Sequence, residues 1–162
     1  MAGERAVPVT AGASTELQPR GERAVLLAMV IAFVLIVAYW VIWYGVDRGI
    51  LASSHAAVYY SFENAFPLAD GWLALALLLG IVSLIRRRPV AVLWTLLAGG
   101  AGIFLGCMDV LFDLEHGIYT TRPADNASAP LIEIALNLIT FTFGGAIIVW
   151  IWRHRAAYLG TR

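Results

Sequence analysis

The stretch AVLLAMVIAFVLIVAYWVIWYG, residues 24–45, decides the fold, because it contains no charged side chain over its whole length. The hydrocarbon core of a bilayer is about 30 Å thick, and roughly 20 mostly apolar residues in a helix cross it. Residues 24–45 therefore predict a membrane-spanning helix. No A-x-A-like cleavage site follows this stretch, so we expect a retained helix and not a removed signal peptide.

Three further stretches of the required length and apolarity follow, at about residues 62–85, 90–112 and 131–152. The chain of 162 residues is 60% hydrophobic, whereas soluble domains are about 45–50% apolar. The sequence thus predicts an all-α protein, a four-helix transmembrane bundle over residues 24–152. Residues 1–23 are small, polar and Pro-containing and predict a disordered cytoplasmic tail, and residues 153–162 predict a short basic cytoplasmic tail.

The arginines predict the orientation of the bundle. Seven lie at the start of the first span, between the second and third spans and after the fourth span: Arg20, Arg23, Arg86, Arg87, Arg88, Arg153 and Arg155. The two other connections hold only Arg48 and Arg122. Because cytoplasmic loops carry the excess of basic residues, we expect both termini in the cytoplasm.

Composition also limits the kind of protein. All eleven basic residues are arginines, which together with the Ala and Gly content suggests a bacterial coding sequence, and hence the inner (plasma) membrane. The formal net charge is zero, so nothing favours nucleic acid as a partner. Cys107 is the single cysteine, which excludes an intramolecular disulfide, CxxC redox chemistry and a thiolate zinc cluster. We expect no cofactor.

Acidic residues concentrate toward the predicted outer side. Eight of the eleven lie there: Asp47, Glu63, Asp70, Asp109, Asp113, Glu115, Asp125 and Glu133. The second span carries Glu63 and Asp70, the third Asp109 and Asp113, and the fourth Glu133 with Asn137. A carboxylate facing lipid at the bilayer centre costs roughly 2.5–3.5 kcal/mol on insertion scales. We therefore expect these three polar ridges to face one another in a shared acidic pocket.

Pro67 lies between the two acids of the second span and allows two interpretations. In one, the helix is continuous, Glu63 and Asp70 share one face, and Asp70 lies roughly 12 Å inside the helix. In the other, which we favour, the helix begins near Pro67, so that Glu63 is interfacial and solvated. In the third span, Gly102 and Gly106, with Ala98 one turn earlier, predict close helix packing.

Candidate site residues follow from these patterns. Asp70 and Asp109 are the leading candidates for a pocket that binds a cation, a proton or a lipid head group, and a second group lines it: Glu63, Asp113, Glu133 and Asn137. His116 is a weak candidate metal ligand, since imidazole and carboxylate groups bind metals, but no HxxxH or HExxH pattern accompanies it and we expect no metal.

Three functional hypotheses remain open. The leading one is a non-enzymatic membrane protein whose acidic pocket binds a small-molecule or lipid ligand, or a membrane-protein partner. The alternative is a membrane-embedded enzyme or carrier for a lipidic or cationic substrate, with Asp70 and Asp109 as proton donor and acceptor. The third is a purely structural subunit of a larger complex.

Four segments together resemble small bacterial four-span membrane proteins over about residues 24–155: FENAFPLADGWLALALLLG, RRRPVAVLW, GIFLGCMDVLFDLEHGIY and ALNL. That resemblance implies the fold and no activity. The architecture is also similar to that of the EXPERA-type proteins, which include emopamil-binding sterol isomerase and the sigma-2 receptor. Those proteins keep acidic residues in a bundle cavity that meets an amine or carbocation-like ligand, a part that the resemblance would give to Glu63, Asp70 and Asp109.

Overall fold

The computed structural model describes residues 19–52, 55–120 and 128–160, and in these ranges all regular structure is helical. The predicted all-α class is therefore confirmed. Residues 1–18, most of the predicted disordered tail, lie outside the described residues. The elements are α1 (Glu22–Ile42), a π-helical turn η1 (Trp43–Asp47), a 3-10 turn η2 (Arg48–Ile50), α2 (Ala57–Glu63), α3 (Pro67–Ile85), α4 (Val90–Glu115) and α5 (Ala129–Leu159).

Four segments are long and apolar enough to cross a membrane: Glu22–Ile50, Ala57–Ile85, Val90–Glu115 and Pro130–Leu159. This is the architecture of a multi-pass membrane protein. The last helix continues past the predicted end of its span at Trp152 and stops at Leu159. Gly160 follows with φ 69°, the left-handed conformation in which glycine commonly ends a helix.

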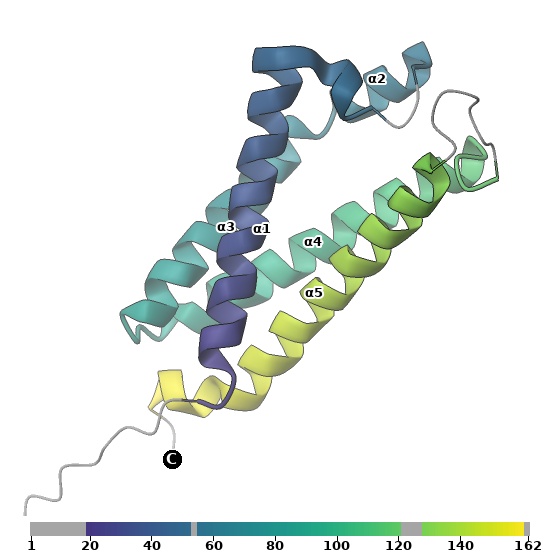
Figure 1. Ribbon diagram of the computed structural model, residues 1–162. Coiled ribbons are helices and arrows are strands. Elements are labelled where there is room, and N and C mark those ends of the chain that lie inside the picture. The colour runs from purple at the N-terminus through teal and green to yellow at the C-terminus, as the bar shows by residue number, and fades with distance from the viewer. Residues whose placement is uncertain (1–18, 53–54, 121–127, 161–162) are drawn as a thin grey trace, which may run out of the picture.

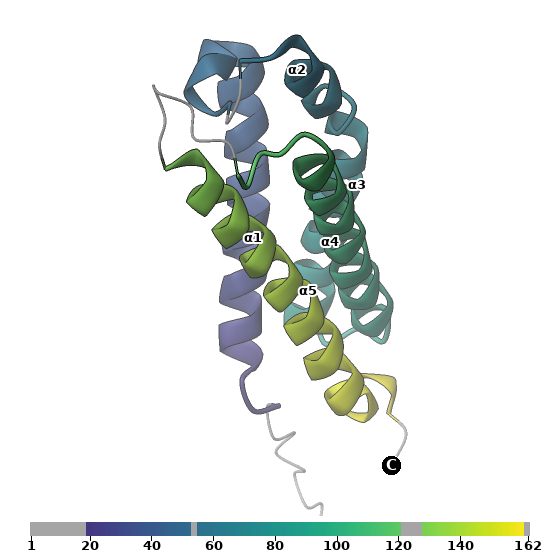
Figure 2. The same ribbon diagram turned by 90° about the vertical axis from the view of Figure 1, so that its right-hand side faces the viewer.

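The four long helices run alternately up and down along the bundle (Figures 1 and 2). One end holds the start of α1, the turn between α3 and α4, and the end of α5, and we call it the arginine end. The other holds η1, η2, α2 and the start of α5, and we call it the acidic end. Helix α1 packs mainly against α3, α3 against α4, and α4 against α5. In Figure 1, α1 and α5 diverge toward the acidic end.

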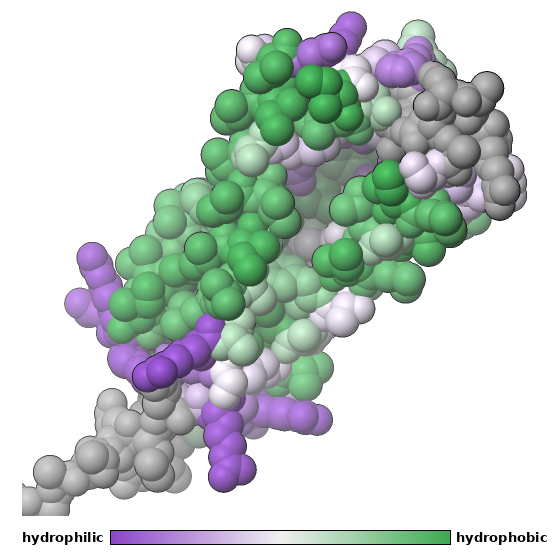
Figure 3. Space-filling view, in the orientation of Figure 1, coloured by the Kyte–Doolittle hydropathy of each residue, from purple (hydrophilic) through white to green (hydrophobic). Residues whose placement is uncertain are grey.

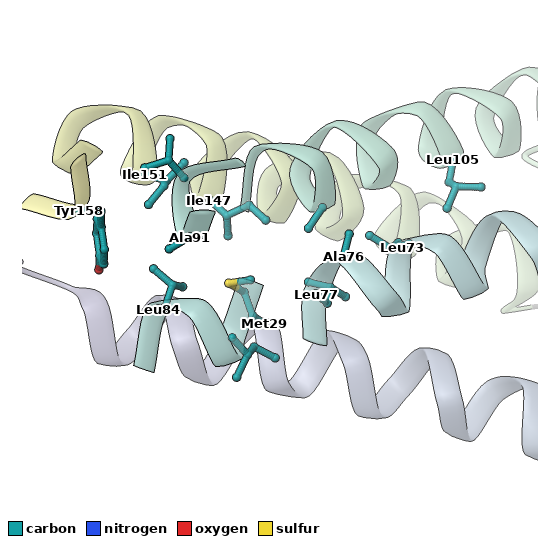
Figure 4. Close-up of a cluster of buried hydrophobic side chains, with 13 residues drawn as sticks. Met29, Leu73, Ala76, Leu77, Leu84, Ala91, Leu105, Ile147, Ile151 and Tyr158 are labelled. Carbon is teal, nitrogen blue, oxygen red and sulfur yellow. The ribbon is translucent and has the colours of Figure 1, made fainter. Parts of the chain in front are cut away.

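The apolar core is densest toward the arginine end. Figure 4 shows Met29 of α1 beside Leu77 and Leu84 of α3, all fully buried. A Cβ atom built on Gly80 of α3 would lie 2.8 Å from the Met29 Cε atom. A side chain at position 80 would therefore push α1 away from α3, so Gly80 forms the notch in which Met29 sits.

Helices α4 and α5 make the closest backbone contact. A Cβ on Gly99 would lie 2.8 Å from the Gly144 carbonyl oxygen, and a Cβ on Gly144 would lie 2.9 Å from the Gly99 carbonyl oxygen. Close helix packing at Gly106 was expected and agrees with the structure, since a Cβ on Gly106 would lie 3.3 Å from Thr140 of α5. The expectation of equally close packing at Gly102 is wrong, because a Cβ there would meet no atom within 4 Å.

The second predicted span is broken between α2 and α3. Helix α3 begins at Pro67, where the missing N–H and the fixed φ of proline suit the first helical position. The favoured interpretation of Pro67 is therefore confirmed. The continuous-helix interpretation is wrong: Glu63 ends α2, whereas Asp70 lies in the first turn of α3 and not roughly 12 Å inside a longer helix.

Candidate functional site

Five carboxyl groups from four helices lie within electrostatic range of one another at the acidic end, and we call them the acidic cluster: Glu63 of α2, Asp70 of α3, Asp109 and Asp113 of α4, and Glu133 of α5. The carboxyl group of Asp109 interacts electrostatically with those of the other four. Glu63 also interacts with Asp70 and Asp113. The structure thus brings together the polar ridges of the three predicted spans, as the cost of exposing them to lipid requires.

Glu63 is held by two tyrosines. The Tyr39 hydroxyl of α1 donates to the Glu63 Oε2 atom at 2.8 Å, and the Tyr59 hydroxyl also bonds to this carboxylate. Tyr59 is buried and Glu63 is half-buried. Glu63 is therefore less solvated than expected, because the Tyr39 and Tyr59 hydroxyls bond to its carboxylate.

Asp70 accepts a hydrogen bond from an indole. The Trp40 Nε1 atom lies 2.9 Å from the Asp70 Oδ2 atom, and the neighbouring Trp43 Nε1 atom donates to the Asn64 side-chain oxygen at 3.0 Å. The ring centroids of Tyr39 and Trp43 are 5.7 Å apart in a stacked arrangement. A cluster of aromatic residues at a helix end is typical of an interfacial belt, so the sequence did not reveal that these rings supply donors to the acids.

Asp113 belongs to a buried polar network with Asn137 of α5. The Asn137 Nδ2 atom lies 3.1 Å from the Asp113 Oδ2 atom and 2.9 Å from the Tyr119 hydroxyl oxygen. Asp113 and Asn137 are only 4% and 6% exposed. Burial, followed by the hydrogen bond with Asp113, raises the pKa of Tyr119 to about 12. Tyr119 therefore remains a neutral donor at neutral pH, a role that its loop position did not predict.

The hydrogen-bond donors described around Glu63, Asp70 and Asp113 are uncharged. Among the residues that the structure describes, no arginine or histidine forms an ion pair with Glu63, Asp70, Asp109 or Asp113. Within the same part of the chain, the Asp109 carboxyl group accepts no hydrogen bond. The donors around the cluster are tyrosine, tryptophan and asparagine, which satisfy oxygen atoms without cancelling charge.

The molecular surface is hollowed between the acidic-end half of α1 and α5 (Figure 3). Hydrophilic residues lie within this hollow, and hydrophobic residues surround its opening. The opening is on the side of the bundle, where a membrane would place lipid.

A separate groove on the surface between α3 and α4 is apolar, and it has a volume of about 610 Å³. No member of the acidic cluster lines it. Its lining residues are Ala65, Leu68, Ala69, Trp72, Leu97, Gly100, Ala101, Phe104 and Leu105.

The His116 side chain contacts Phe112 of its own helix. Its Nδ1 atom lies 2.9 Å from the Phe112 carbonyl oxygen, and its ring stacks on the Phe112 ring at 4.1 Å. Over the described ranges, no three His, Cys, Asp or Glu side chains form a group that could hold a metal ion.

A different carboxylate, Glu22, anchors the arginine end. It is only 2% exposed and accepts hydrogen bonds from the Arg87 Nη2 atom at 2.8 Å and the Tyr158 hydroxyl at 3.1 Å. Nearby, the Trp150 Nε1 atom donates to the Arg20 carbonyl oxygen at 2.9 Å. We call these contacts the arginine-end clasp. It joins the start of α1, the turn between α3 and α4, and the end of α5, and Glu22 was not among the predicted site residues.

Comparison of the chain with protein-family models, with curated proteins and with solved structures finds no match. The function is therefore inferred from the geometry of the site.

Proposed function

We propose that this multi-pass membrane protein binds the cationic head group of an amphiphile in the acidic cluster. The observation that carries the proposal is the convergence of Glu63, Asp70, Asp109 and Asp113 with no cation paired to them among the described residues. Carboxylates at membrane depth are retained where they pair with a charge or serve a function. A bound ammonium group would provide the missing charge.

The aromatic residues beside the acids support a cation over a neutral ligand. Trp40 and Trp43 of α1 lie next to Asp70 and Asn64, to which they donate hydrogen bonds. Tryptophan and tyrosine faces attract cations, most strongly where water is excluded. A quaternary or protonated amine could therefore contact carboxylates and ring faces together.

The side opening of the hollow supports an amphiphile over a small soluble cation. Hydrophobic residues frame the entrance (Figure 3), and exposed apolar side chains continue along both helices, such as Val41 of α1 and Leu136 of α5. An alkyl tail would lie between these side chains.

The test is a binding titration of the full-length protein in neutral dodecyl maltoside micelles. The probe is dodecyltrimethylammonium, whose effect on tryptophan fluorescence reports binding near Trp40 and Trp43. We expect saturable binding that weakens about tenfold in each of E63Q, D70N and D109N. The matched control is E115Q, an exposed carboxylate at the same end of α4. Equal affinity for the wild type and all three cluster variants would contradict the proposal.

A second candidate function is proton-coupled transport or catalysis on a lipidic or cationic substrate, with Asp70 and Asp109 as the proton-handling groups. It is favoured by the Asp109 carboxyl group, which accepts no hydrogen bond among the described residues and is therefore available for protonation. Proteoliposomes that contain a pH-sensitive dye distinguish it. Proton movement driven by the probe, and abolished in D109N, would favour this second function over simple binding.

A further inference from the structure

We infer that the arginine end binds anionic phospholipids, whose phosphate groups contact arginines that the fold itself does not use. The described residues of this end include one carboxylate, that of Glu22, and seven arginines: Arg20, Arg23, Arg86, Arg87, Arg88, Arg153 and Arg155. This surface lies at the opposite end of the bundle from the acidic cluster, so it is independent of the proposed function.

The arginine-end clasp uses the charge of only one of these arginines. The Arg87 Nη2 atom lies 2.8 Å from the Glu22 Oε2 atom. Arg87 has φ 52°, a left-handed conformation that is uncommon outside glycine. Arg20 takes part in the clasp through its carbonyl oxygen and not through its guanidinium group. In the part of the chain that the structure describes, none of the six arginines other than Arg87 forms an ion pair.

These six arginines are exposed and come from three elements that the clasp joins. Two lie at the start of α1, two in the turn between α3 and α4, and two near the end of α5: Arg20, Arg23, Arg86, Arg88, Arg153 and Arg155. Hydrophilic side chains project from this end of the molecule in Figure 3. Like charges that are held at one end repel one another, and an anionic partner relieves that repulsion.

The six arginines lie where the apolar surface of the bundle ends. On α1, Leu27 is 61% exposed and lies one turn from Arg23. On α3, Ile85 is 65% exposed and directly precedes Arg86, and on α5, Trp152 is 54% exposed and directly precedes the two arginines of that helix. Exposed apolar side chains lie in the hydrocarbon, and arginines at helix ends reach the head groups. The membrane therefore brings lipid phosphates to these guanidinium groups.

Arg155 is already held in place at this level. Its Cζ atom lies 4.2 Å from the centroid of the Trp152 ring, and its Nη1 atom donates to the Trp152 carbonyl oxygen at 2.6 Å. A guanidinium group has five N–H donors in a planar fork that matches two phosphate oxygens. Because its neighbour is an exposed indole of the kind found at membrane interfaces, a lipid phosphate fits this position better than an acidic protein segment.

The test is a calorimetric titration of dioctanoylphosphatidylglycerol into the full-length protein in dodecyl maltoside micelles. The matched lipid is dioctanoylglycerol, which has the same chains and no phosphate. We expect saturable binding of the phosphate lipid that weakens about fivefold for each arginine removed, hence about 25-fold in R86Q/R88Q and in R153Q/R155Q. The control R48Q removes an exposed arginine at the acidic end and should leave the affinity unchanged. Because no chain is inserted into a membrane in micelles, a role of these arginines in orientation does not affect the result.

Three outcomes would overturn the inference. The first is equal affinity of the wild type for the two lipids, which needs no variant. The second is a phosphatidylglycerol affinity in both double variants equal to that of R48Q, which would leave the arginines to membrane orientation or to a protein partner. The third is competition by inorganic phosphate that exceeds the effect of sodium chloride at equal ionic strength, since it would identify a site for free phosphate.

Discussion

The two ends of the bundle use buried carboxylates in opposite ways. At the arginine end, Glu22 accepts bonds from a tyrosine hydroxyl and from Arg87, so its charge is paired. At the acidic end, Glu63 accepts a similar tyrosine bond from Tyr39, but no arginine pairs with it among the described residues. Glu22 thus joins helices through a charged partner, whereas the described partners of Glu63 are the neutral hydroxyl groups of Tyr39 and Tyr59.

The largest expected effect comes from removing Arg87, the charged partner of Glu22 at the arginine end. The R87M variant leaves Glu22 buried with Tyr158 as its remaining partner, so we expect the free energy of unfolding to fall by about 3 kcal/mol. Unfolding by sodium dodecyl sulfate, monitored by tryptophan fluorescence, measures this change. The control R88M removes an exposed neighbour and should change stability by less than about 0.5 kcal/mol. Equal stability of R87M and the wild type would remove the contrast between the two ends.

The next effect tests the backbone contact that holds α5 beside α4. In G144A the added methyl group would lie 2.9 Å from the Gly99 carbonyl oxygen, so we expect a loss of about 2 kcal/mol in the free energy of unfolding. Its neighbour provides the control, since a Cβ on Gly145 meets no atom within 4 Å. G145A should be neutral or stabilising by up to about 1 kcal/mol. The same detergent unfolding assay measures both, and a G144A protein as stable as G145A would show that the helices are not in close contact.

A smaller effect, of opposite sign, is expected at the acidic end. D109N replaces a buried acid that lies among four other carboxyl groups, so the free energy of unfolding should stay the same or rise by about 1 kcal/mol. The matched variant at the paired end, E22Q, should be destabilised in the same unfolding assay, because it loses the ion pair with Arg87. A drop in stability in D109N as large as in E22Q would mean that Asp109 is structural.

The smallest effect concerns the Asp113 network. Y119F removes a hydroxyl that bonds to Asp113 and Asn137, and should lower the free energy of unfolding by about 1 kcal/mol. The cluster charge remains, so probe affinity should change less than twofold, about 0.4 kcal/mol. The fluorescence titration checks affinity and detergent unfolding checks stability. A tenfold loss of affinity in Y119F would extend the binding site to Tyr119.

Much of the fold was predictable because a membrane imposes strong rules. The number of long apolar stretches predicted the number of spans, because a helix needs roughly 20 mostly apolar residues to cross the bilayer. Proline chemistry located the start of α3 at Pro67. The convergence of Asp70 and Asp109 was predictable from the cost of exposing carboxylates to lipid.

The partners of those carboxylates were not predictable, because they depend on how helices rotate and fold back. The position of α2 over the bundle end brings Glu63 to Tyr39 of α1, and no local pattern specifies that contact. Trp40 could as well have faced the membrane interface as Asp70. Glu22 lies outside the predicted spans. Its partners Arg87 and Tyr158 are distant in the sequence, so no local pattern indicated that it is buried.

The most direct measurement is a calorimetric titration of dodecyltrimethylammonium into three proteins: the wild type, the triple variant E63Q/D70N/D109N, and E115Q. If the unpaired carboxylates form a cation site, the wild type and E115Q bind with the same affinity, and the triple variant loses the saturable heat while remaining folded. Undiminished binding by a folded triple variant would contradict the assignment of the acidic cluster as the site.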